Sequence, residues 1–488
     1  SRGLGDVYKR QLLEEEIEMT LKMNDATKNA RLYDVNCTAD AQGMNLWVEE
    51  LLHRYQDSIC CGKYQSVFRC MNIKDENVLI GAAGRLVGMR ILVSRSAIQG
   101  ELDYHSEPVF AITEASEEGF QSIPFQQVFT LCNRLRNKLK DLVGPEFYRV
   151  PVLGGLKSII LSDEPQEIIN YYLPEIELCG TGNRFSLFAA GYIPEDISLP
   201  GEAEKQSHAL CPISSKVQCP GKDEYMVRMA GVLEKLKSDF VQKVVVARKC
   251  TVTPCEAFDK LDYTAYLLDR YFQEYFYLFR QGEDAYWTGI SPEIIMKQSG
   301  SVAVTKPLAG TRKKCEDDAV NQQVRKELTA TSKDIIEHEH ALYFMVDQLE
   351  KAGIGKVHID KNKTVLETPY AFHIKSEISV QLKEGVSCFD IIGAIYPPAT
   401  IWGIPVDRTE HILAETEPFS REYFTGLYGY WNYAGDADTA LVIRSAKVED
   451  GTVSVYAGGG IVKYSDPNAE FDETVNKMRP LLSYFTEK

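Results

Sequence analysis

The clearest hydrophobic pattern lies near the C-terminus. Residues 452–457 alternate between polar and apolar side chains, which predicts a strand. Asp466 and Pro467 are typical of a helix N-cap and first turn, so a helix is expected from there to about Tyr484. Its apolar stripe consists of Phe471, Val475, Met478 and Leu482. A second stripe, roughly 120° away at 100° per residue, consists of Glu470, Glu473 and Lys477.

Three glycines, Gly458 to Gly460, stand between this strand and this helix. Glycine permits positive φ and close backbone approach, so a loop whose amides bind a carboxylate is expected here. The alternative for the helix behind it is a solvated face on which Glu473 and Lys477 form an i,i+4 ion pair.

The same patterns divide the rest of the chain into further elements. Helices are expected over 126–142, 224–238, 263–274 and 321–352. Strands are expected over 78–93, 108–112, 185–193, 243–248, 287–296, 302–305, 371–382 and 439–448. The polar segment 205–223 contains two prolines and is the expected boundary between an N-terminal half, 32–223, and a C-terminal region, 224–488. Residues 1–11 resemble translated library-adapter sequence, and 1–31 are expected to be a non-native or disordered leader.

Composition narrows the class of protein. The 488 residues are 44% hydrophobic and 25% charged, as in soluble globular proteins. A net charge of −16 without a basic run argues against binding nucleic acid or an anionic membrane. The twelve cysteines include no Cys-x-x-Cys, which favours reduced thiols over a zinc site or disulfide scaffold. No apolar run approaches the roughly 18 residues of a membrane helix, so we expect a cytoplasmic protein.

Two acid pairs are candidates for metal binding. Asp334 and Glu337 are three residues apart in the expected helix 321–352, as Glu470 and Glu473 are in the last helix, so each pair shares a helix face. Four converging carboxylates would suit Mg²⁺, which prefers oxygen ligands. The alternative is two exposed helices with acidic faces.

Four further residues are candidates for other chemistry. Lys243 begins an apolar strand, either as an edge ion pair or as a desolvated amine whose lowered pKa would let it act as a base. Glu293 lies at a turn after a strand, and His373 lies in an alternating strand, where a core histidine is commoner than a catalyst. Arg444 interrupts an apolar strand and needs a partner such as a carboxylate.

These segments, in this order and at these spacings, resemble the chorismate-utilising enzymes, which include isochorismate synthases, salicylate synthases and the large subunits of anthranilate and aminodeoxychorismate synthases. The resemblance is strong over 224–482 and weaker over 32–223. It implies an α+β fold, with two facing antiparallel sheets flanked by helices in one large domain, so that 205–223 would be an internal linker. It also implies chorismate as substrate and Mg²⁺ as cofactor.

The resemblance implies roles for individual residues. Glu337 and Glu473 match direct Mg²⁺ ligands, and Asp334 and Glu470 match acids that hold its waters. The positions that match those binding the substrate carboxylates are Gly458, Gly460, Arg444 and Lys477. Those that match residues beside the ring are His373 and Thr311.

Two positions divide the family by its nucleophile. Lys243 matches the general base at C2 in members that use water, and Glu293 matches the general acid that protonates the departing 4-hydroxyl. Members that use ammonia lack that lysine and normally need a glutamine amidotransferase partner, so none is expected here. Aminodeoxychorismate synthases carry a lysine where this chain has Ala309.

The product is the remaining choice. Thr400, residues 403–405 and residues 332–337 resemble salicylate synthases, whereas Phe424 resembles isochorismate synthases and Trp402 fits neither pattern. We expect salicylate, formed through isochorismate. Release of isochorismate is the alternative, and an ammonia-using enzyme is less favoured. A chorismate-binding regulator without activity would be expected to lose Lys243 or Glu293, and a scaffold would not need both acid pairs. Both a monomer and a homodimer remain open.

Overall fold

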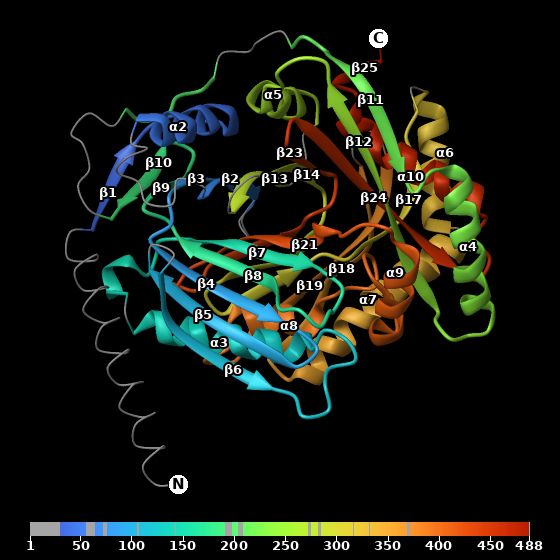
Figure 1. The fold of residues 1–488 in the computed structure, drawn as a ribbon, viewed down its shortest axis with the longest axis horizontal. Helices are drawn as coiled ribbons and strands as arrows, with labels where there is room; N and C mark the ends of the chain where they lie inside the picture. Colours follow the sequence, from blue (N-terminus) through green and yellow to red (C-terminus); the bar gives the residue numbers. More distant parts are fainter. Residues whose placement is uncertain are drawn as a thin grey trace.

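The computed structural model describes residues 30–487 apart from 55–63, 72–75, 105–106, 142, 191–197, 204–207, 272–274, 282–284, 316, 331 and 368–370. Two large sheets face each other, and helices cover their outer sides (Figure 1). This arrangement confirms the expected α+β fold of two facing antiparallel sheets in one domain.

The first sheet has 13 strands among the described residues, and only its β11–β25 pair is parallel. Its strands are β1 (Arg31–Asn36), β2 (Tyr64–Met71), β3 (Asn77–Ala83), β9 (Ile176–Thr181), β10 (Arg184–Ala189), β11 (Cys211–Cys219), β12 (Lys243–Pro254), β13 (Tyr275–Gln281), β14 (Tyr286–Ser291), β20 (Gly403–Ile404), β23 (Ser445–Glu449), β24 (Thr452–Val462) and β25 (Phe485–Glu487).

The second sheet has 12 strands in the same described ranges. Its strands are β4 (Val87–Val93), β5 (Ala97–Tyr104), β6 (Glu107–Ala115), β7 (Val152–Ser158), β8 (Gln166–Leu173), β15 (Ile294–Ser299), β16 (Val302–Thr305), β17 (Leu308–Lys313), β18 (Gly355–Glu367), β19 (Ala371–Leu382), β21 (Glu422–Trp431) and β22 (Ala437–Leu441).

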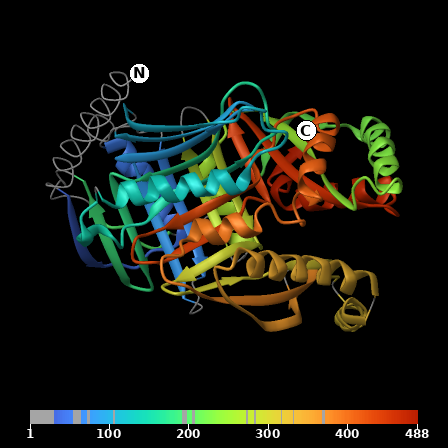
Figure 2. The ribbon, with the colours of Figure 1, turned by 90° about the horizontal axis from the view of Figure 1, so that it is seen from below.

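Helices lie outside both sheets (Figures 1 and 2). They are α2 (Ala41–Arg54), α3 (Phe125–Lys140), the 3₁₀ turn η1 (Pro145–Phe147), α4 (Lys222–Lys237), α5 (Lys260–Arg270), α6 (Asp318–Ala330), α7 (Ser332–Ala352), α8 (Cys388–Ile395), α9 (Val406–Thr416) and α10 (Pro467–Leu482). In the described part of the chain, no helix is both long and apolar enough to cross a membrane.

Aromatic side chains fill the space between the sheets. The rings of Phe279 on β13 and Tyr428 on β21 stack with their centroids 3.6 Å apart, which joins the two inner faces. Phe68, Tyr277 and Trp287 belong to the same buried cluster. Rings of this size bury much apolar area, so this layer holds the sheets together.

Three predicted strands are each two strands, one in each sheet. Segment 78–93 forms β3 and β4, segment 287–296 forms β14 and β15, and segment 439–448 forms β22 and β23. The chain turns from one sheet to the other at Gly84, with φ of +76°, and at Arg444, with φ of +51°. Each of the three segments is rich in apolar residues along its length, so composition alone did not reveal the change of sheet.

Other boundaries also differ from the predictions. The predicted helix 321–352 is two helices, α6 and α7, and Thr331 between them lies outside the described residues. Ser332 is the first residue of α7, and hydroxyl residues favour helix ends over interiors. The polar segment 205–223 contains β11, which pairs with β12, so it is not simply a linker. The predicted strand 185–193 corresponds to β10 up to Ala189, and 191–197 lie outside the description.

Candidate active site

The three glycines expected to form a loop lie inside strand β24. Gly458, Gly459 and Gly460 pair with Ala247, Val246 and Val245 of β12, and none of the three has a positive φ. The prediction of a loop was therefore wrong, because glycine composition favours turns but pairing with β12 decides the structure.

Close approach explains why glycine stands at these positions. A Cβ at Gly460 would lie 2.9 Å from Cε of Lys243, and one at Gly458 would lie 3.3 Å from Cγ1 of Val245. A Cβ at Gly459 would instead lie 3.2 Å from Oε2 of Glu470. Successive residues of a strand point to opposite faces. Gly458 and Gly460 thus leave room on the face that holds Lys243, and Gly459 on the face under α10.

Helix α10 brings Lys477 onto the edge of this strand. The Lys477 ammonium donates to the carbonyl oxygen of Gly458 at 2.8 Å and pairs with Oε1 of Glu473 at 2.7 Å. The helix starts as predicted, because the Asp466 side chain caps it by accepting from the amide of Asn468 at 3.3 Å and Pro467 occupies the first turn. The cap fixes where α10 begins, and the buried Phe471 and Thr474 hold the helix against the protein.

Arg444 reaches the same helix from the turn between β22 and β23. Its Nη1 donates to the carbonyl oxygen of Lys477 at 3.4 Å. Burial lowers the pKa of the Arg444 guanidinium, and the negative charge of Glu473 opposes that shift. Since φ of +51° is uncommon for a residue with a side chain, the backbone at Arg444 is strained, as is frequent where a side chain must be aimed at a site.

Glu293 is the buried carboxyl group of the site, only 7% exposed, and lies just after β14. Burial raises its pKa to about 7, while the Thr400 hydroxyl, which donates to Oε1 at 3.1 Å, and the charges of Lys243 and Lys477 hold it down. A carboxyl group that titrates near neutral pH can deliver a proton under physiological conditions. The structure thus brings Glu293, Thr400, Lys243 and Lys477 together.

His373 lies in β19, opposite Thr311 of β17 in the strand register. Burial and the charges of Arg444 and Lys477 lower the pKa of the imidazole to about 4, so His373 is neutral at pH 7. A neutral imidazole in this position can form hydrogen bonds but adds no charge. Thr311 is placed by its backbone only, because its side chain lies outside the described residues.

Two aromatic residues complete the surroundings. Phe424 is buried, and its ring stacks on that of Tyr456 with 5.4 Å between centroids. Trp402 is fully buried in an apolar cluster with Val244, and its indole nitrogen donates to the carbonyl oxygen of Val406 at 3.3 Å. The loop that carries Thr400 is therefore well packed, although Trp402 matched neither sequence pattern.

The acids expected to bind a metal are described only in part. Glu473 and Glu470 lie on the exposed and half-buried side of α10, and Oε1 of Glu470 accepts from the Ser465 hydroxyl at 2.7 Å. Asp334 and Glu337 lie on the first turns of α7, but their side chains are outside the description. Among the side chains that are described, no three His, Cys, Asp or Glu residues gather as a metal site.

A buried ion pair near the site, formed by Glu417 and Arg421 at 2.6 Å, was not predicted from the sequence. The available signal was an acid and a base four residues apart just before the strongly apolar strand β21.

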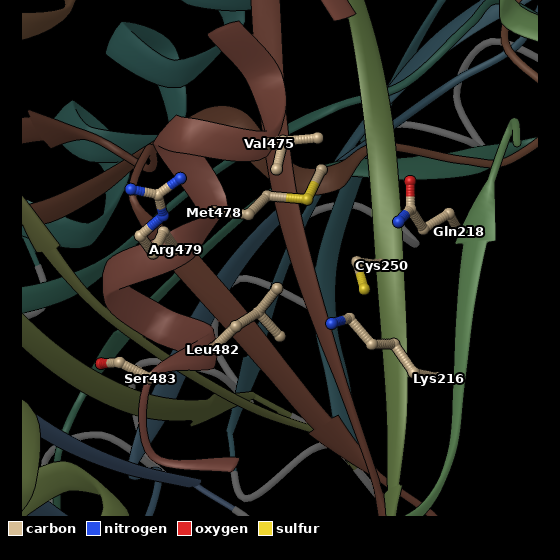
Figure 3. A pocket seen from close by; sticks show the side chains of 8 residues that line it. All are labelled: Lys216, Gln218, Cys250, Val475, Met478, Arg479, Leu482 and Ser483. Atoms are coloured by element: carbon tan, nitrogen blue, oxygen red, sulfur yellow. The ribbon is translucent and has the colours of Figure 1, made fainter. Parts of the chain in front are cut away.

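A groove on the other side of α10 is separate from this site (Figure 3). Its apolar floor includes Met478 and Leu482, and Lys216 and Gln218 of β11 form one wall. Its volume of about 250 Å³ is below the roughly 300–1,000 Å³ of most ligand pockets. Lys216 is already paired with Glu487, and the amide oxygen of Gln218 accepts from Arg248.

Known proteins resemble this chain in sequence. The family model for chorismate binding enzymes matches residues 162–483. Anthranilate synthase component 1 of Pseudomonas putida is 32% identical over 209 residues, which are 43% of this chain and 42% of that protein. Isochorismate synthase DhbC of Bacillus subtilis is 31% identical over 198 residues, which are 40% of this chain and 49% of that protein. The matched segments thus span less than half of each relative.

Solved structures resemble it in fold. MenF, the menaquinone-specific isochorismate synthase from Escherichia coli, superposes with a TM-score of 0.70 over 93% of this chain and 94% of that one, at 19% identity. Anthranilate synthase component I from Streptococcus pneumoniae superposes with a TM-score of 0.62 over 83% and 92%, at 16% identity. Since the matching family model covers more than half of the sequence, from before β8 to the end of α10, the chain belongs to the chorismate binding enzymes.

Proposed function

We propose that the protein converts chorismate to isochorismate by adding water at C2 with loss of the 4-hydroxyl, and then eliminates pyruvate to give salicylate. The observation that carries the first step is the position of Lys243 and Glu293 in one cluster, with Glu293 holding a carboxyl group whose pKa is about 7. One amine and one protonated carboxyl are the base and acid that this exchange of hydroxyl groups requires.

The first step is balanced within the site. Lys243, in its neutral amine form, takes a proton at Nζ from the attacking water as the water oxygen bonds to C2. The ring double bonds shift, the C4–O bond breaks, and Glu293 donates its proton to the departing hydroxyl. One water enters and one leaves, so the reaction is an isomerisation. Arg444 and Lys477 are the cations that would hold the substrate carboxylates.

The proposed cofactor is Mg²⁺, which Glu337, Glu473, Asp334 and Glu470 would hold. Carboxylates are the only donors in this set, which fits a hard cation. When bound, the ion supplies positive charge to a substrate carboxylate. The chain's own part is to hold Glu473 in place, which Lys477 does through their 2.7 Å ion pair.

The second step needs positioning more than further acid or base. The hydrogen on C2 moves to the methylene carbon of the enolpyruvyl group, the C3–O bond breaks, and the ring becomes aromatic as pyruvate leaves. Thr400 supports this step because it lies beside Glu293. There its bulk can restrict the enolpyruvyl group of the substrate. Phe424 cannot donate a hydrogen bond to the pyruvyl carboxylate, so isochorismate is expected to escape early in the reaction.

The second candidate is an isochorismate synthase that releases its product. Phe424 favours it, because its ring is enclosed against Tyr456 and offers no polar group. The relatives described above include isochorismate synthases, which also favours this candidate.

Product chromatography tests both candidates. Chorismate is incubated with enzyme and Mg²⁺, with and without ammonium and in excess chelator. We expect salicylate and pyruvate, with isochorismate early, and loss of activity in chelator. Phe424→Tyr should lower the isochorismate fraction and Thr400→Ala should raise it. Isochorismate at equilibrium with chorismate and no salicylate would establish the second candidate, and anthranilate would exclude both.

A further inference from the structure

Arg421 is a buried guanidinium whose five N–H groups all have acceptors. Its side chain is 2% exposed and that of Glu417 is 4% exposed. Nε and Nη2 donate to the two carboxylate oxygens of Glu417 at 2.8 and 2.6 Å. Nη2 also donates to the carbonyl oxygen of Val245 at 2.5 Å, and Nη1 donates to the carbonyl oxygen of Ile401 at 3.0 Å and the hydroxyl of Thr425 at 3.2 Å. Arginine has five such donors in a rigid plane, so no other side chain can replace this set.

These acceptors belong to three segments that each carry a residue of the candidate site. Val245 lies two residues after Lys243 on β12, Ile401 follows Thr400, and Thr425 follows Phe424. Glu417 adds a second link to β12, because its Oε1 accepts from the amide of Ala247 at 2.7 Å. The three segments are far apart in sequence, and the ion pair joins them at one point.

The surroundings fix the guanidinium itself. Trp402 lies beside it, with 5.4 Å from the guanidinium carbon to the ring centroid, and the carbonyl oxygen of Trp402 accepts from the amide of Val245 at 2.8 Å. Thr425 has φ of +64°, which is rare for a β-branched residue. Its hydroxyl lies 3.0 Å from that of Ser158 on β7. The strained backbone is thus held by contacts on both sides.

We propose that Arg421, oriented by Glu417, is a positioning residue that sets Lys243, Thr400 and Phe424 relative to one another. The inference rests on the proposed function and deepens it, because these residues are the base, the hydroxyl on the acid and the aromatic wall of that same site. A buried ion pair is weak evidence for stability, since an apolar pair of similar volume is often at least as stable. We therefore assign the Arg421–Glu417 pair a role in holding the three segments in a fixed arrangement, and not a role in adding stability.

A second buried ion pair provides a matched control. Arg85 and Asp103 are 1% and 0% exposed, and Arg85 also donates to Asn170 at 3.1 Å and contacts Tyr64. Its partners lie on β2, β5 and β8, none of which carries a candidate site residue. Arg85→Lys therefore disturbs an equally buried network without touching the three segments.

The experiment compares Arg421→Lys with Arg85→Lys in the full chain. Lysine offers three donors in place of five, so both variants should lower Tm. Only Arg421→Lys should lower kcat for chorismate consumption, on the order of 10²-fold, with KM changed much less. It should also move the alkaline limb of the pH profile to higher pH, because Thr400 then leaves Glu293 and its hydrogen bond no longer lowers the pKa of that carboxyl group. The same kcat and the same alkaline limb of the pH profile in the two variants would overturn the proposal.

Hydrogen exchange separates this inference from the proposed function. Peptides that contain residues 245–247 and 400–402 should exchange amide hydrogens faster in Arg421→Lys than in wild type. In Arg85→Lys their exchange rates should equal those of the wild type. This readout does not depend on turnover. If the wild type consumes no chorismate, the proposed function fails, and exchange alone decides the positioning role: faster exchange at these peptides supports it, and unchanged exchange overturns it.

Discussion

Glu293 is a buried carboxyl group, and ionising it inside the folded protein lowers the free energy of unfolding. Its pKa of about 7 in the folded protein exceeds the ordinary 4.5, so the folded state binds this proton more tightly than the unfolded state. The resulting stability is present below about pH 4.5 and is lost as the pH rises through 7. The cost of ionising Glu293 in place is therefore greatest at alkaline pH, where the acid no longer carries the proton that the reaction needs.

Glu293→Gln should for this reason stabilise the protein while removing its activity. At pH 8 the variant is expected to gain on the order of 3 kcal/mol in the free energy of unfolding, because it lacks the buried charge. Near pH 4.5 the gain should vanish. Thermal unfolding of both proteins from pH 4.5 to 8 measures this difference. A Tm difference that does not change with pH would show that Glu293 is not the buried acid described here.

Thr400 sets the protonation of Glu293 through one hydrogen bond. A donor to the carboxylate stabilises its ionised form, so Thr400→Val should raise the pKa of Glu293. The alkaline limb of kcat/KM, which reports loss of the acid's proton, should then move to higher pH. Thr409→Val is the control, since Thr409 is a buried threonine on the neighbouring α9 whose hydroxyl donates to the carbonyl oxygen of Pro405. Identical limbs in wild type and Thr400→Val would contradict the assignment.

At the scale of elements, the pairing of β24 with β12 makes room for Lys243. In Gly460→Ala the new Cβ would meet Cε of Lys243, which is near the end of a flexible side chain and can move aside. We therefore expect little change in Tm but a fall in kcat on the order of 10²-fold, because the amine is displaced. Gly231→Ala in α4, where a Cβ would meet nothing within 4 Å, is the control. Full activity of Gly460→Ala would mean that the position of Lys243 does not matter.

The sequence predicted those elements whose signals are local. Helix α10 follows from the Asp466 cap, Pro467 and its apolar stripe, which act within one or two turns. The change of sheet at Arg444 could not be predicted, because strand-forming residues on both sides of Arg444 do not tell which sheet each strand joins. The prediction of a loop at the glycines of β24 was wrong for a related reason. Their strand conformation depends on pairing with β12, some 200 residues away in the sequence.

The candidate site was predictable to the extent that a family resemblance covers it. Lys243, Glu293 and Lys477 were proposed from matching positions, and the structure gathers them. The spacing of Glu417 and Arg421 is visible in the sequence, but their role is not, because Arg421 also contacts Val245, 176 residues away. Long-range contacts of this kind leave no periodic or compositional trace in a single sequence.

At the scale of the molecule, both sheets depend on the N-terminal half. Strands β1 to β3 extend the first sheet, and β4 to β8 extend the second, so the aromatic layer between the sheets is built from both halves of the chain (Figure 2). The N-terminal half therefore supports a site whose candidate residues all lie after residue 242.

The most direct test of the central claim asks where the new hydroxyl comes from. The reaction is run in ¹⁸O-labelled water with Mg²⁺ and ammonium present, and the products are analysed by mass spectrometry. If water attacks C2, isochorismate and any salicylate formed from it will each carry one ¹⁸O in the hydroxyl, and Lys243→Ala will give neither. Unlabelled product, or anthranilate formed from the ammonium, would contradict the account.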